Sequence, residues 1–326
     1  PYSTLVIDHL TYIRRGLYDI LLVRNADETG GLLIELSAFL GLFKNQHEIQ
    51  TFKTSFTNFF IQALNTSTFK EQFPKVKLSG LILRSIQHYG RESDRSEILY
   101  GQNYMYHTLT INNNISLKFQ INANSFFQVN SRGAENLYNI ILNWVSSASS
   151  SSGNGDKSDS KLKKTMILDI CCGSGTIGLC MAQQVHSVIG LELVPEAIKD
   201  AKINNVLNNI TNCQYICGRA EHTIQQAITL YRLAKEKCPT LSLIGIVDPP
   251  RGGLHPQVIK TLRNCYELKT LIYVSCNPKT LAQNLEKLIG PASKKFRHKP
   301  FTPLKAIPVD MFPQTDHCEL VMYLQR

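Results

Sequence analysis

From Thr165 onward the sequence alternates regularly between strand and helix signals. Five short apolar stretches, separated by helical ones, are predicted strands: Met166–Ile170, Ser187–Glu192, Gln214–Cys217, Leu243–Asp248 and Thr270–Cys276. Such alternation is typical of a parallel sheet covered by helices on both faces. Two extended segments follow, Leu304–Asp310 and Cys318–Leu324, joined by a turn that contains proline. We therefore predict an α/β fold, a doubly wound and mostly parallel sheet with a C-terminal hairpin.

The first part of the chain has a different pattern, in which strand-like stretches flank one long helix. The strand-like stretches are Ile20–Arg24, Leu32–Ala38, Leu81–Gln87 and Ile115–Asn122. The predicted helix spans Gln46–Asn65, and its apolar residues recur at three- and four-residue spacing as one core-facing stripe: Ile49, Phe52, Phe56, Phe59, Phe60 and Ala63. This pattern predicts a smaller α+β domain over residues 1–123, before the α/β domain over residues 124–326.

A low-complexity stretch interrupts the second domain near its start. An amphipathic helix is predicted after Asn130, with its apolar residues at Leu137, Ile140, Ile141 and Trp144. The sequence then becomes rich in serine and glycine. Residues 146–163 have too little apolar surface to offset the entropy cost of ordering them, so we expect a surface insertion.

The apolar content allows a packed core but no membrane span. Hydrophobic residues make up 43% of the 326 residues, which is enough for one large domain or two ordinary ones. The best apolar run, Leu32–Phe43, is shorter than the roughly 20 residues that cross a bilayer, and it contains Glu35. We expect a soluble protein with no membrane partner. The first residue is Pro1 rather than Met, which predicts that the natural N-terminus and any targeting segment are missing.

Cysteine usage and charge limit the location and the partners. All nine cysteines lie between Cys171 and Cys318, and none forms a Cys-x-x-Cys pair of the kind that binds zinc or an iron–sulfur cluster. We expect no metal and an intracellular location, cytoplasmic or nuclear, with a mitochondrial one left open by the missing N-terminus. The net charge is +10, and residues 125–326 hold 23 Lys and Arg against 15 Asp and Glu. This excess suits RNA as a partner, and solubility alone would also explain it.

A glycine-rich loop follows the first strand of the predicted parallel sheet. Its sequence runs from Asp169 to Gly178 as Asp-Ile-Cys-Cys-Gly-Ser-Gly-Thr-Ile-Gly. Glycines let the backbone approach a ligand closely, and the carboxyl end of a strand faces the ligand crevice. Glu192 ends the next strand, where an acid can accept hydrogen bonds from ribose hydroxyls. These residues predict a nucleotide-like ligand and fit a nicotinamide dinucleotide as well as S-adenosylmethionine.

Two further motifs end the fourth and fifth predicted strands. Asp248-Pro249-Pro250 resembles the motif by which many methyltransferases hold the transfer region, and it favours S-adenosylmethionine. Cys276 lies at the same sheet edge, where a thiol can act as a nucleophile. A lone aspartate can equally cap a helix, and a lone cysteine is more commonly inert core, so the interpretation depends on their shared position.

A thiol at this position is suited to activating a pyrimidine. Carbon 5 of uracil is a poor nucleophile until a group adds at carbon 6, which a cysteine can do. A base must then remove the proton of carbon 5 so that the thiol can be expelled. The candidate bases are Glu319 and His317 at the start of the last predicted strand. Without this chemistry, the same stretch would be an ordinary polar hairpin.

Five separated motifs occur in the order found in the RNA (uracil-5-)-methyltransferase family, and the C-terminal two thirds of the chain resembles its eukaryotic tRNA-modifying branch. The motifs are Asn124–Asn130, Leu168–Gly178, Asp248–Leu254, Tyr273–Pro278 and Asp310–Glu319. The resemblance implies a class I S-adenosylmethionine-dependent methyltransferase fold. It also implies methylation of carbon 5 of a uridine in RNA, most closely uridine 54 in the tRNA T-loop.

The resemblance also assigns roles to individual residues. It makes Cys276 the nucleophile, Glu319 the proton-abstracting base and Asp248 a further catalytic residue. The N-terminal domain is expected to position the RNA, and Phe126 and Phe127 offer apolar surface either to a flipped base or to the core. The expected contacts to S-adenosyl-L-methionine are Gln128, Cys171, Gly173, Gly175, Glu192 and Asp248.

Some alternatives remain open on the sequence alone. Some bacterial family members bind an iron–sulfur cluster through four cysteines, and residues 1–170 contain none, so a cluster is not expected. Ribosomal or mitochondrial RNA could replace tRNA as the substrate. Methylation of an exocyclic amine is disfavoured because Arg251, not an aromatic residue, follows the prolines. A non-catalytic RNA-binding or chaperone role is the alternative of another class, against which Cys276 and Glu319 argue. The sequence indicates no particular oligomeric state.

Overall fold

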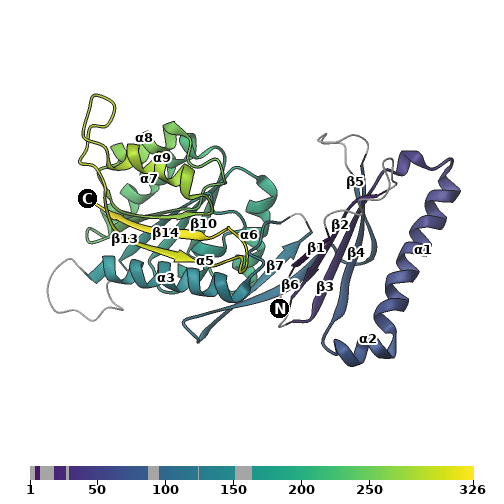
Figure 1. The fold of residues 1–326 in the computed structure, drawn as a ribbon. Coiled ribbons are helices and arrows are strands. Elements are labelled where there is room, and N and C mark those ends of the chain that lie inside the picture. Colours follow the sequence, from purple (N-terminus) through teal and green to yellow (C-terminus); the bar gives the residue numbers. More distant parts are fainter. Residues whose placement is uncertain (1–3, 8–17, 27–28, 87–94, 124, 151–163) are drawn as a thin grey trace. The chain divides into compact units, whose positions relative to one another are not determined.

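The computed structural model describes residues 4–7, 18–26, 29–86, 95–123, 125–150 and 164–326. It contains two compact units (Figure 1). The first unit contains residues 1–109 and 118–129, and the second contains residues 110–117 and 130–326. The expected domain boundary, between residues 123 and 124, therefore falls inside the first unit.

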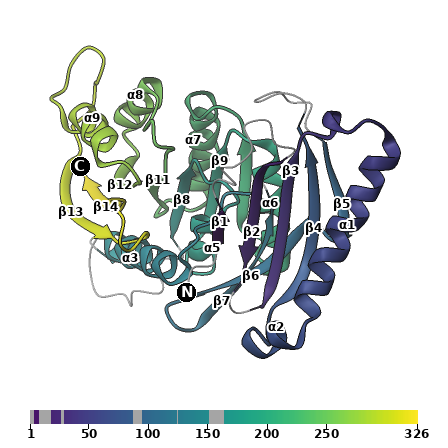
Figure 2. The same ribbon diagram turned by 45° about the vertical axis from the view of Figure 1, so that its right-hand side comes forward.

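The first unit is built on a five-stranded sheet (Figure 2). Its strands, in spatial order, are β1 (Thr4–Ile7), β2 (Tyr18–Asn25), β3 (Gly31–Ala38), β4 (Lys77–Ser85) and β5 (Arg95–Gly101). β3 and β4 pair in parallel, and the other neighbours pair antiparallel. The crossover between β3 and β4 contains the 3-10 turn η1 (Leu40–Leu42), α1 (Gln46–Asn65) and α2 (Ser67–Gln72). A right-handed crossover of this length is what a parallel pair requires.

The long helix predicted over Gln46–Asn65 is confirmed, but its apolar stripe is not uniformly packed. Phe52, Phe56 and Phe60 pack against the buried residues of β3 and β4. Phe59 was expected to share that face and is instead 63% exposed. Its ring contacts the ring of Phe60 edge-on, with the ring centroids 5.2 Å apart. At about 100° per residue, two adjacent positions cannot both point at the same sheet.

A two-stranded hairpin, β6 (Tyr104–Ile111) and β7 (Ile115–Asn122), spans the division between the units. Its tip belongs to the second unit because it is held by the first helix there, α3 (Ser131–Ser150). The backbone amide of Thr110 donates to Glu135 Oε1 at 2.7 Å, and that of Asn112 donates to Asn139 Oδ1 at 2.9 Å. The rest of the hairpin belongs to the first unit.

The second unit is built on a seven-stranded sheet. In spatial order its strands are β10 (Cys213–Cys217), β9 (Ser187–Glu192), β8 (Thr165–Ile170), β11 (Ser242–Val247), β12 (Leu268–Ser275), β14 (Glu319–Gln325) and β13 (Thr302–Val309). The first five pair in parallel, whereas β14 pairs antiparallel with both β12 and β13. The predicted doubly wound sheet with a C-terminal hairpin is confirmed. The strand order reverses between β8 and β11, and such a point opens a ligand crevice at the carboxyl ends of the strands.

Helices cover both faces of this sheet. Besides α3 they are α5 (Thr176–Ala182), α6 (Pro195–Leu207), α7 (Ala220–Lys237), α8 (Pro256–Asn264) and α9 (Pro278–Ile289). The crossovers through α5 and α7 run in opposite directions along the sheet, so their right-handedness places the two helices on opposite faces. α7, α8 and α9 pack in series on one face, and α3 packs beside α5 on the other.

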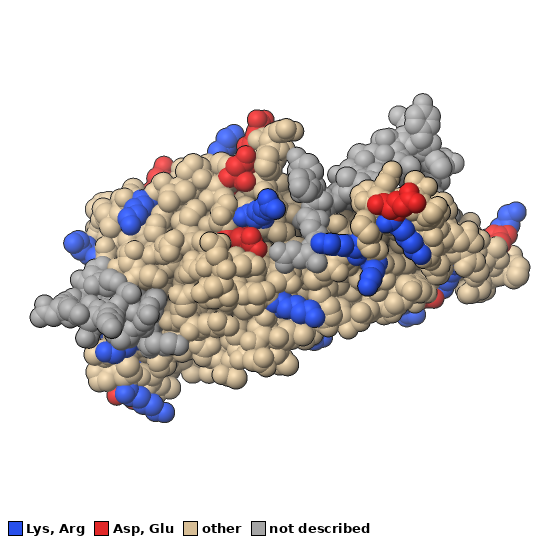
Figure 3. Space-filling view, turned by 90° about the horizontal axis from the view of Figure 1, so that it is seen from below, with Lys and Arg blue, Asp and Glu red and all other residues tan. Residues whose placement is uncertain are grey.

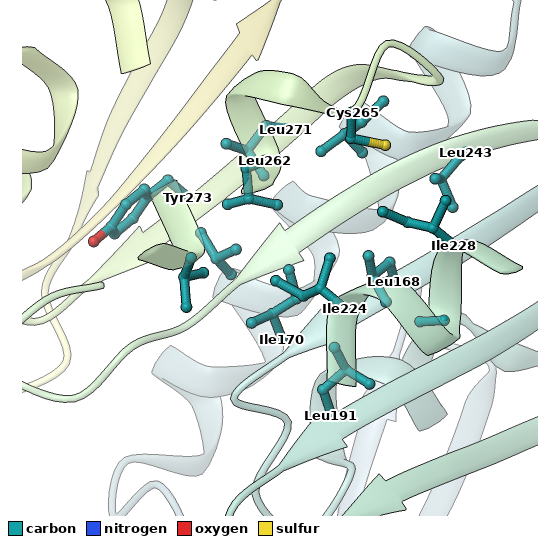
Figure 4. Close-up of a cluster of buried hydrophobic side chains, with 14 of the residues drawn as sticks. Leu168, Ile170, Leu191, Ile224, Ile228, Leu243, Leu262, Cys265, Leu271 and Tyr273 are labelled. Atoms are coloured by element: carbon teal, nitrogen blue, oxygen red, sulfur yellow. The ribbon is translucent and has the colours of Figure 1, made fainter. Parts of the chain in front are cut away.

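A large hydrophobic core lies between the sheet and the helices α7 and α8 (Figure 4). Strand side chains meet helix side chains there, as the view shows for Leu168, Ile170, Leu191, Leu243, Leu271 and Tyr273 against Ile224, Ile228 and Leu262. Each fully buried aliphatic side chain of this kind stabilises the fold by about 1.5–3 kcal/mol. This packing fixes the positions of the strand ends at which the predicted site residues lie.

The serine-rich insertion expected over residues 146–163 begins later than predicted. Residues 146–150 continue α3. The helix absorbs these serines because their hydroxyls bond back to it: Ser146 Oγ donates to the carbonyl of Leu142 at 2.9 Å, and Ser147 Oγ to that of Asn143 at 2.8 Å. Residues 151–163 lie outside the described residues. In the part of the chain that is described, no helix has the length and apolar character needed to cross a membrane.

Candidate active site

Most of the predicted site residues lie at one edge of the seven-stranded sheet, where its parallel strands end. The strands β8, β9, β11 and β12 end there, and the antiparallel β14 begins there because Leu320 pairs with Ser275. The residues placed at this carboxyl edge are Cys171 after β8, Glu192 at the end of β9, Asp248 after β11, Cys276 after β12 and Glu319 at the start of β14. The tertiary structure therefore brings together side chains that are far apart in the sequence.

The glycine loop after β8 is a tight turn with left-handed backbone at Cys171 (φ 64°), Gly173 (φ 55°) and Gly175 (φ 78°). A Cβ atom at Gly175 would lie 2.6 Å from the hydroxyl oxygen of Tyr215, so no side chain fits. A Cβ atom at Gly173 would meet nothing within 4 Å. The amide of Cys171 donates to the carbonyl of Leu191 at 2.9 Å and ties the loop to β9. The loop is thus fixed on one side and open at Gly173, where a ligand can approach the backbone.

Glu192 faces this loop from the end of β9. Its Oε2 accepts from the amide of Gly173 at 3.0 Å, and its Oε1 accepts from the amides of Leu193 and Val194 at 2.7 and 2.9 Å. A carboxylate has about four acceptor positions, so these three bonds leave capacity for a hydroxyl donor. Leu193 and Val194 are 58% and 47% exposed and offer apolar surface beside the carboxylate. The set fits a ligand that carries both a ribose and an apolar ring.

Asp169, at the end of β8, is a buried carboxyl that the sequence analysis quoted only as the start of the loop. It is fully buried, and its Oδ2 accepts from the amide of Gly178 at 3.0 Å, near the N-terminus of α5. Burial raises its pKa to about 7, against the opposing effect of the Gly178 hydrogen bond, and the charge of Glu192 adds to the rise. The carboxyl group of Asp169 therefore changes its protonation state near neutral pH. Its hydrogen bond to the amide of Gly178 also holds the loop to α5.

The predicted nucleophile, Cys276, is half-buried beside two carboxyl groups. Burial raises the pKa of its thiol, and the charges of Glu319 and then Asp248 raise it further, while Arg251 opposes them. Coulomb effects of this kind act over a few ångströms in a partly desolvated site. The three residues predicted to be catalytic therefore share one electrostatic environment.

The two catalytic carboxyls are themselves perturbed. Burial raises the pKa of Asp248 well above its usual range, and the charges of Glu319 and Asp169 add to the rise. Burial also raises the pKa of Glu319, which is 4% exposed. Within the described residues, Glu319 Oε2 is buried without a hydrogen-bond partner. A desolvated carboxylate with an unpaired oxygen is a strong base, and perturbed pKa values of this kind cluster at functional sites.

Asn284 of α9 holds the loop after Asp248 through its side-chain oxygen. Asn284 Oδ1 accepts from the amide of Leu254 at 2.7 Å and from the hydroxyl of Tyr273 at 2.9 Å. Gly253 has φ 75°, and a Cβ atom there would lie 2.9 Å from Asn284 Oδ1. The sequence analysis did not identify Asn284. The available signal was a polar residue between Leu281 and Leu288 on the apolar face of a helix.

Two hydrogen bonds join that loop to the segment after Cys276. The carbonyl oxygen of Arg251 accepts from Asn277 Nδ2 at 3.1 Å and from Thr280 Oγ1 at 3.2 Å. Asn277 also caps α9, since its Oδ1 accepts from the amide of Lys279 at 3.1 Å. These bonds hold the backbone of Arg251 next to the nucleophile segment, and its exposed guanidinium is the charge that opposes the rise in the thiol pKa.

The motif around Gln128 lies in the first compact unit. Gln128 is buried there, at 9% exposure, and its cofactor contact stays a prediction. The two phenylalanines before it differ in burial: one packs in the core and the other is exposed. Phe127 packs against His107 and Phe119, with ring centroids 5.2 and 5.7 Å away, whereas Phe126 is 75% exposed. Of the two rings, only that of Phe126 is accessible to a ligand.

Among the described residues, no three or more His, Cys, Asp and Glu side chains are grouped to hold a metal ion. All nine cysteines are free thiols. On the face in Figure 3, basic side chains stand as separate groups among uncharged and acidic ones.

Comparisons with known proteins identify the family of this chain. A family model described as tRNA (Uracil-5-)-methyltransferase matches residues 66–326. The human protein tRNA (uracil-5-)-methyltransferase homolog A is 41% identical over 212 residues, which are 65% of this chain and 31% of that protein. An uncharacterized RNA methyltransferase of Clostridium tetani is 31% identical over 320 residues, 96% of this chain and 57% of the relative.

A solved structure shares the fold. The tRNA (uracil-54, C5)-methyltransferase of Pyrococcus abyssi, in complex with S-adenosyl-L-homocysteine, superimposes with a TM-score of 0.60 at 22% identity. The match covers 95% of this chain and 60% of that one. The second unit thus has the S-adenosylmethionine-dependent methyltransferase fold. The chain spans less than two thirds of the length of each of these three proteins.

Proposed function

This chain belongs to the tRNA (uracil-5-)-methyltransferase family, and from that premise we propose that it methylates carbon 5 of a uridine in tRNA. The observation that carries the proposal is the shared environment of the Cys276 thiol and the Glu319 and Asp248 carboxyls at the carboxyl edge. The uridine that we propose is the one at position 54 in the T-loop, on the strength of the motif resemblance. A nucleophile and a desolvated base are the two groups that this reaction needs.

S-adenosyl-L-methionine is the proposed cofactor, and when bound it supplies the electrophilic methyl group. The residues of the second unit that would hold it are those of the glycine loop (Cys171, Gly173 and Gly175), Glu192 for the ribose, and Asp248. A contact from Gln128 is expected on the motif resemblance alone. The exposed apolar surface of Leu193 and Val194 suits the adenine. Because the Glu192 carboxylate is already oriented by three backbone amides, it needs little rearrangement to accept the ribose hydroxyls.

Cys276 is proposed to activate the uracil. The raised pKa of its thiol means that it is protonated at neutral pH, so it must release its proton to water before it attacks. The sulfur then forms a bond to carbon 6, and the electrons of the double bond between carbons 5 and 6 move toward the oxygen on carbon 4. Carbon 5 thereby becomes nucleophilic, which the unmodified ring does not allow.

Glu319 is proposed to complete the reaction. After carbon 5 has received the methyl group it still carries a hydrogen, and the carboxylate of Glu319 removes it as a proton. The electrons of that carbon–hydrogen bond rebuild the double bond between carbons 5 and 6, and the bond from carbon 6 to sulfur breaks. Burial in the site keeps water away from Oε2 of Glu319, which strengthens the carboxylate as a base.

The first unit is proposed to position the RNA. The ring of Phe126 is exposed at the end of the segment that leads to Gln128, and aromatic side chains of this kind stack on bases that leave their helix.

Transfer RNA that contains 5-fluorouridine tests the mechanism, because fluorine cannot leave as a proton. With S-adenosylmethionine, we expect a covalent RNA–protein complex that survives a denaturing gel and maps to Cys276 by mass spectrometry. The Cys276→Ala variant should form no complex and lose methyl transfer by about four orders of magnitude or more.

The matched control is Cys238→Ser, a free cysteine beyond the end of α7, which should still form the complex. A complex at another cysteine, or none with the unmutated protein, would refute the cysteine mechanism. Undiminished tRNA binding without any methyl transfer would instead favour the non-catalytic RNA-binding role.

A further inference from the structure

The loop between α9 and β13, residues 290–300, is strongly basic and contains no acidic residue. Its basic side chains are Lys294, Lys295, Arg297, His298 and Lys299. Four of them are exposed, and His298 is half-buried. The loop lies beside the C-terminus of the chain, next to α9 in Figures 1 and 2. Nothing in the proposed chemistry uses it.

This loop lies at the amino edge of the sheet, opposite the candidate active site. α9 starts just after Cys276 and runs back along the sheet to Gly290. β13 then starts where Thr302 pairs with Gln325, and Gln325 pairs with Thr270 near the first residues of β12. With a rise of about 3.3 Å per strand residue, the loop is roughly 20 Å from Cys276.

A buried arginine of α8 holds the backbone of the loop. Arg263 is fully buried, and its guanidinium donates to the carbonyl oxygens of Lys287 at 3.2 Å, Gly290 at 2.9 Å and His298 at 3.0 Å. The ring of Phe296 lies against the same guanidinium, with its centroid 5.2 Å from Cζ. Lys295 Nζ lies 5.6 Å from the same ring centroid, so the aromatic residue of the loop is half-buried beside two cationic side chains.

Two further residues fix the basic positions. Asn264 Nδ2 donates to the carbonyl of Lys295 at 3.0 Å, and its Oδ1 accepts from the amide of Arg297 at 2.9 Å. Arg326 Nη1 donates to the carbonyl of Lys299 at 3.4 Å. Because these backbone groups are bonded inward, the charged side chains of Lys295, Arg297 and Lys299 are left exposed. The loop thus presents cations from a preorganised backbone.

An exposed aromatic residue extends this surface. Tyr266 is 56% exposed, its ring centroid is 6.1 Å from that of His298, and Lys269 Nζ is 6.0 Å from it. The neighbouring acid, Glu267, is paired with Arg232 at 2.7 Å, which neutralises it. Beside them lies a hollow of about 800 Å³ whose lining includes Tyr266, Lys269 and Arg232. We call Tyr266, Lys269 and residues 294–299 the basic rim.

We propose that the basic rim binds the phosphate backbone of the tRNA substrate at a place remote from the methylated uridine. Lysine and arginine side chains gain affinity for RNA by releasing its counterions, and an exposed tyrosine beside them adds stacking surface. An anionic membrane fits less well, because Phe296, the aromatic residue of the loop, is half-buried against Arg263 and leaves no exposed apolar ring to insert. The proposal rests on the proposed function only for the identity of the RNA.

Binding of unmodified, full-length tRNA over a range of salt concentrations tests the rim. The double variant K295A/K299A removes two exposed charges of the loop, and K199A/K202A removes two exposed lysines of α6 as a matched control. We expect the rim variant to bind about tenfold more weakly at low salt and its salt dependence to fall by about 2 in slope, with the control unchanged.

Two readouts separate this role from a general loss of charge or folding. A short stem-loop with only the T arm should bind the rim variant as well as the unmutated protein, because it does not reach the amino edge. In methylation, KM for full-length tRNA should rise while kcat stays the same. The melting temperature should not change, since both lysine side chains are exposed.

The outcomes of this test are independent of the proposed function. Unchanged tRNA affinity and salt slope in K295A/K299A would overturn the rim proposal even if methylation is observed. Equal losses of affinity for full-length tRNA and for the stem-loop in the rim variant would overturn it too. So would a rim variant that loses binding to phosphatidylserine vesicles but keeps its affinity for tRNA. Absence of methylation by the unmutated protein would refute the proposed function, and a selective loss of tRNA affinity in the rim variant would still support the rim.

Discussion

The two edges of the seven-stranded sheet carry buried charges of opposite sign. At the carboxyl edge the buried or half-buried charged groups are acids, Asp169, Asp248 and Glu319, and burial raises their pKa values. At the amino edge they are the arginines Arg263 and Arg326, together with one acid, Glu267, which is paired with Arg232. Burial lowers the pKa of Arg263 and lowers that of Arg326 to about 10. The sheet therefore places the acids Asp169, Asp248 and Glu319 at one edge and the buried arginines at the other.

The direction of the helices explains this difference. Helices that connect parallel strands run antiparallel to them, so their free amides face the carboxyl edge and their free carbonyls face the amino edge. Asp169 accepts from an amide near the start of α5, whereas Arg326 donates to the carbonyls of Leu262, Arg263 and Cys265 at the end of α8. The fold itself therefore favours anionic side chains at one edge and cationic side chains at the other.

Glu319→Gln at the carboxyl edge should lower turnover more than any substitution at the amino edge. An amide cannot take the proton from carbon 5, so we expect turnover to fall by about 10²–10⁴-fold while RNA-linked protein accumulates. Denaturing gels with radiolabelled tRNA measure both quantities. The control at the amino edge is Glu236→Gln, an exposed acid of α7 that should leave turnover unchanged. Normal turnover by Glu319→Gln would remove this residue from the mechanism.

Asp169→Asn tests whether the buried anion costs stability. The pKa of Asp169 is about 7 in the folded protein and about 4 when unfolded, so the folded state holds the extra proton in between. Stability is therefore full below pH 4 and falls, by about 4 kcal/mol from this group, as the pH rises to 7. Urea unfolding at several pH values should show this loss in the unmutated protein and a flatter profile in the variant.

Asp316→Asn, in the exposed turn before β14, is the control for that experiment and should keep the original profile. If Asp169→Asn and Asp316→Asn respond to pH identically, the buried carboxyl does not carry the effect.

Asn284→Ala tests the clamp between the catalytic loop and α9. The change leaves the buried amide of Leu254 and the hydroxyl of Tyr273 without their acceptor, at a cost of about 2–4 kcal/mol in the free energy of unfolding. Asn284→Asp keeps both acceptor positions and should recover most of the loss. Urea unfolding of the two variants measures this, and equal destabilisation by both would show that the hydrogen bonds are not the cause.

Arg251→Gln should give the smallest effect. Arg251 opposes the rise in the pKa of Cys276, so its removal should move the thiol pKa, and with it the rising limb of the pH–rate profile, to higher pH. The guanidinium is exposed and screened by solvent, so we expect a shift below about one pH unit. Arg232→Gln at the amino edge should leave the limb in place. A shift to lower pH would contradict the assigned direction.

Much of the fold was predictable because the signals for it are local. The strand–helix alternation after Thr165 and the span of α1 follow from residue periodicity, and both are confirmed. The edge strand β5 was missed because its side chains are mostly exposed and give no apolar pattern. The start of the insertion was misplaced because serine hydroxyls bonded back to α3, and Phe59 was misassigned because the stripe it was placed on is too wide for one sheet.

The candidate site was likewise predictable only in part. The alternation of strand and helix signals shows which residues end the strands, so Cys276, Asp248 and Glu192 could be placed at one edge from it. What surrounds these residues follows from tertiary packing: the raised pKa of Asp169, the acceptor role of Asn284 and the hydrogen bonds that Asn277 and Thr280 donate to Arg251. These depend on burial and on contacts between residues far apart in the chain, which no local pattern records, because desolvation and hydrogen bonding arise only once the sheet and its helices have packed.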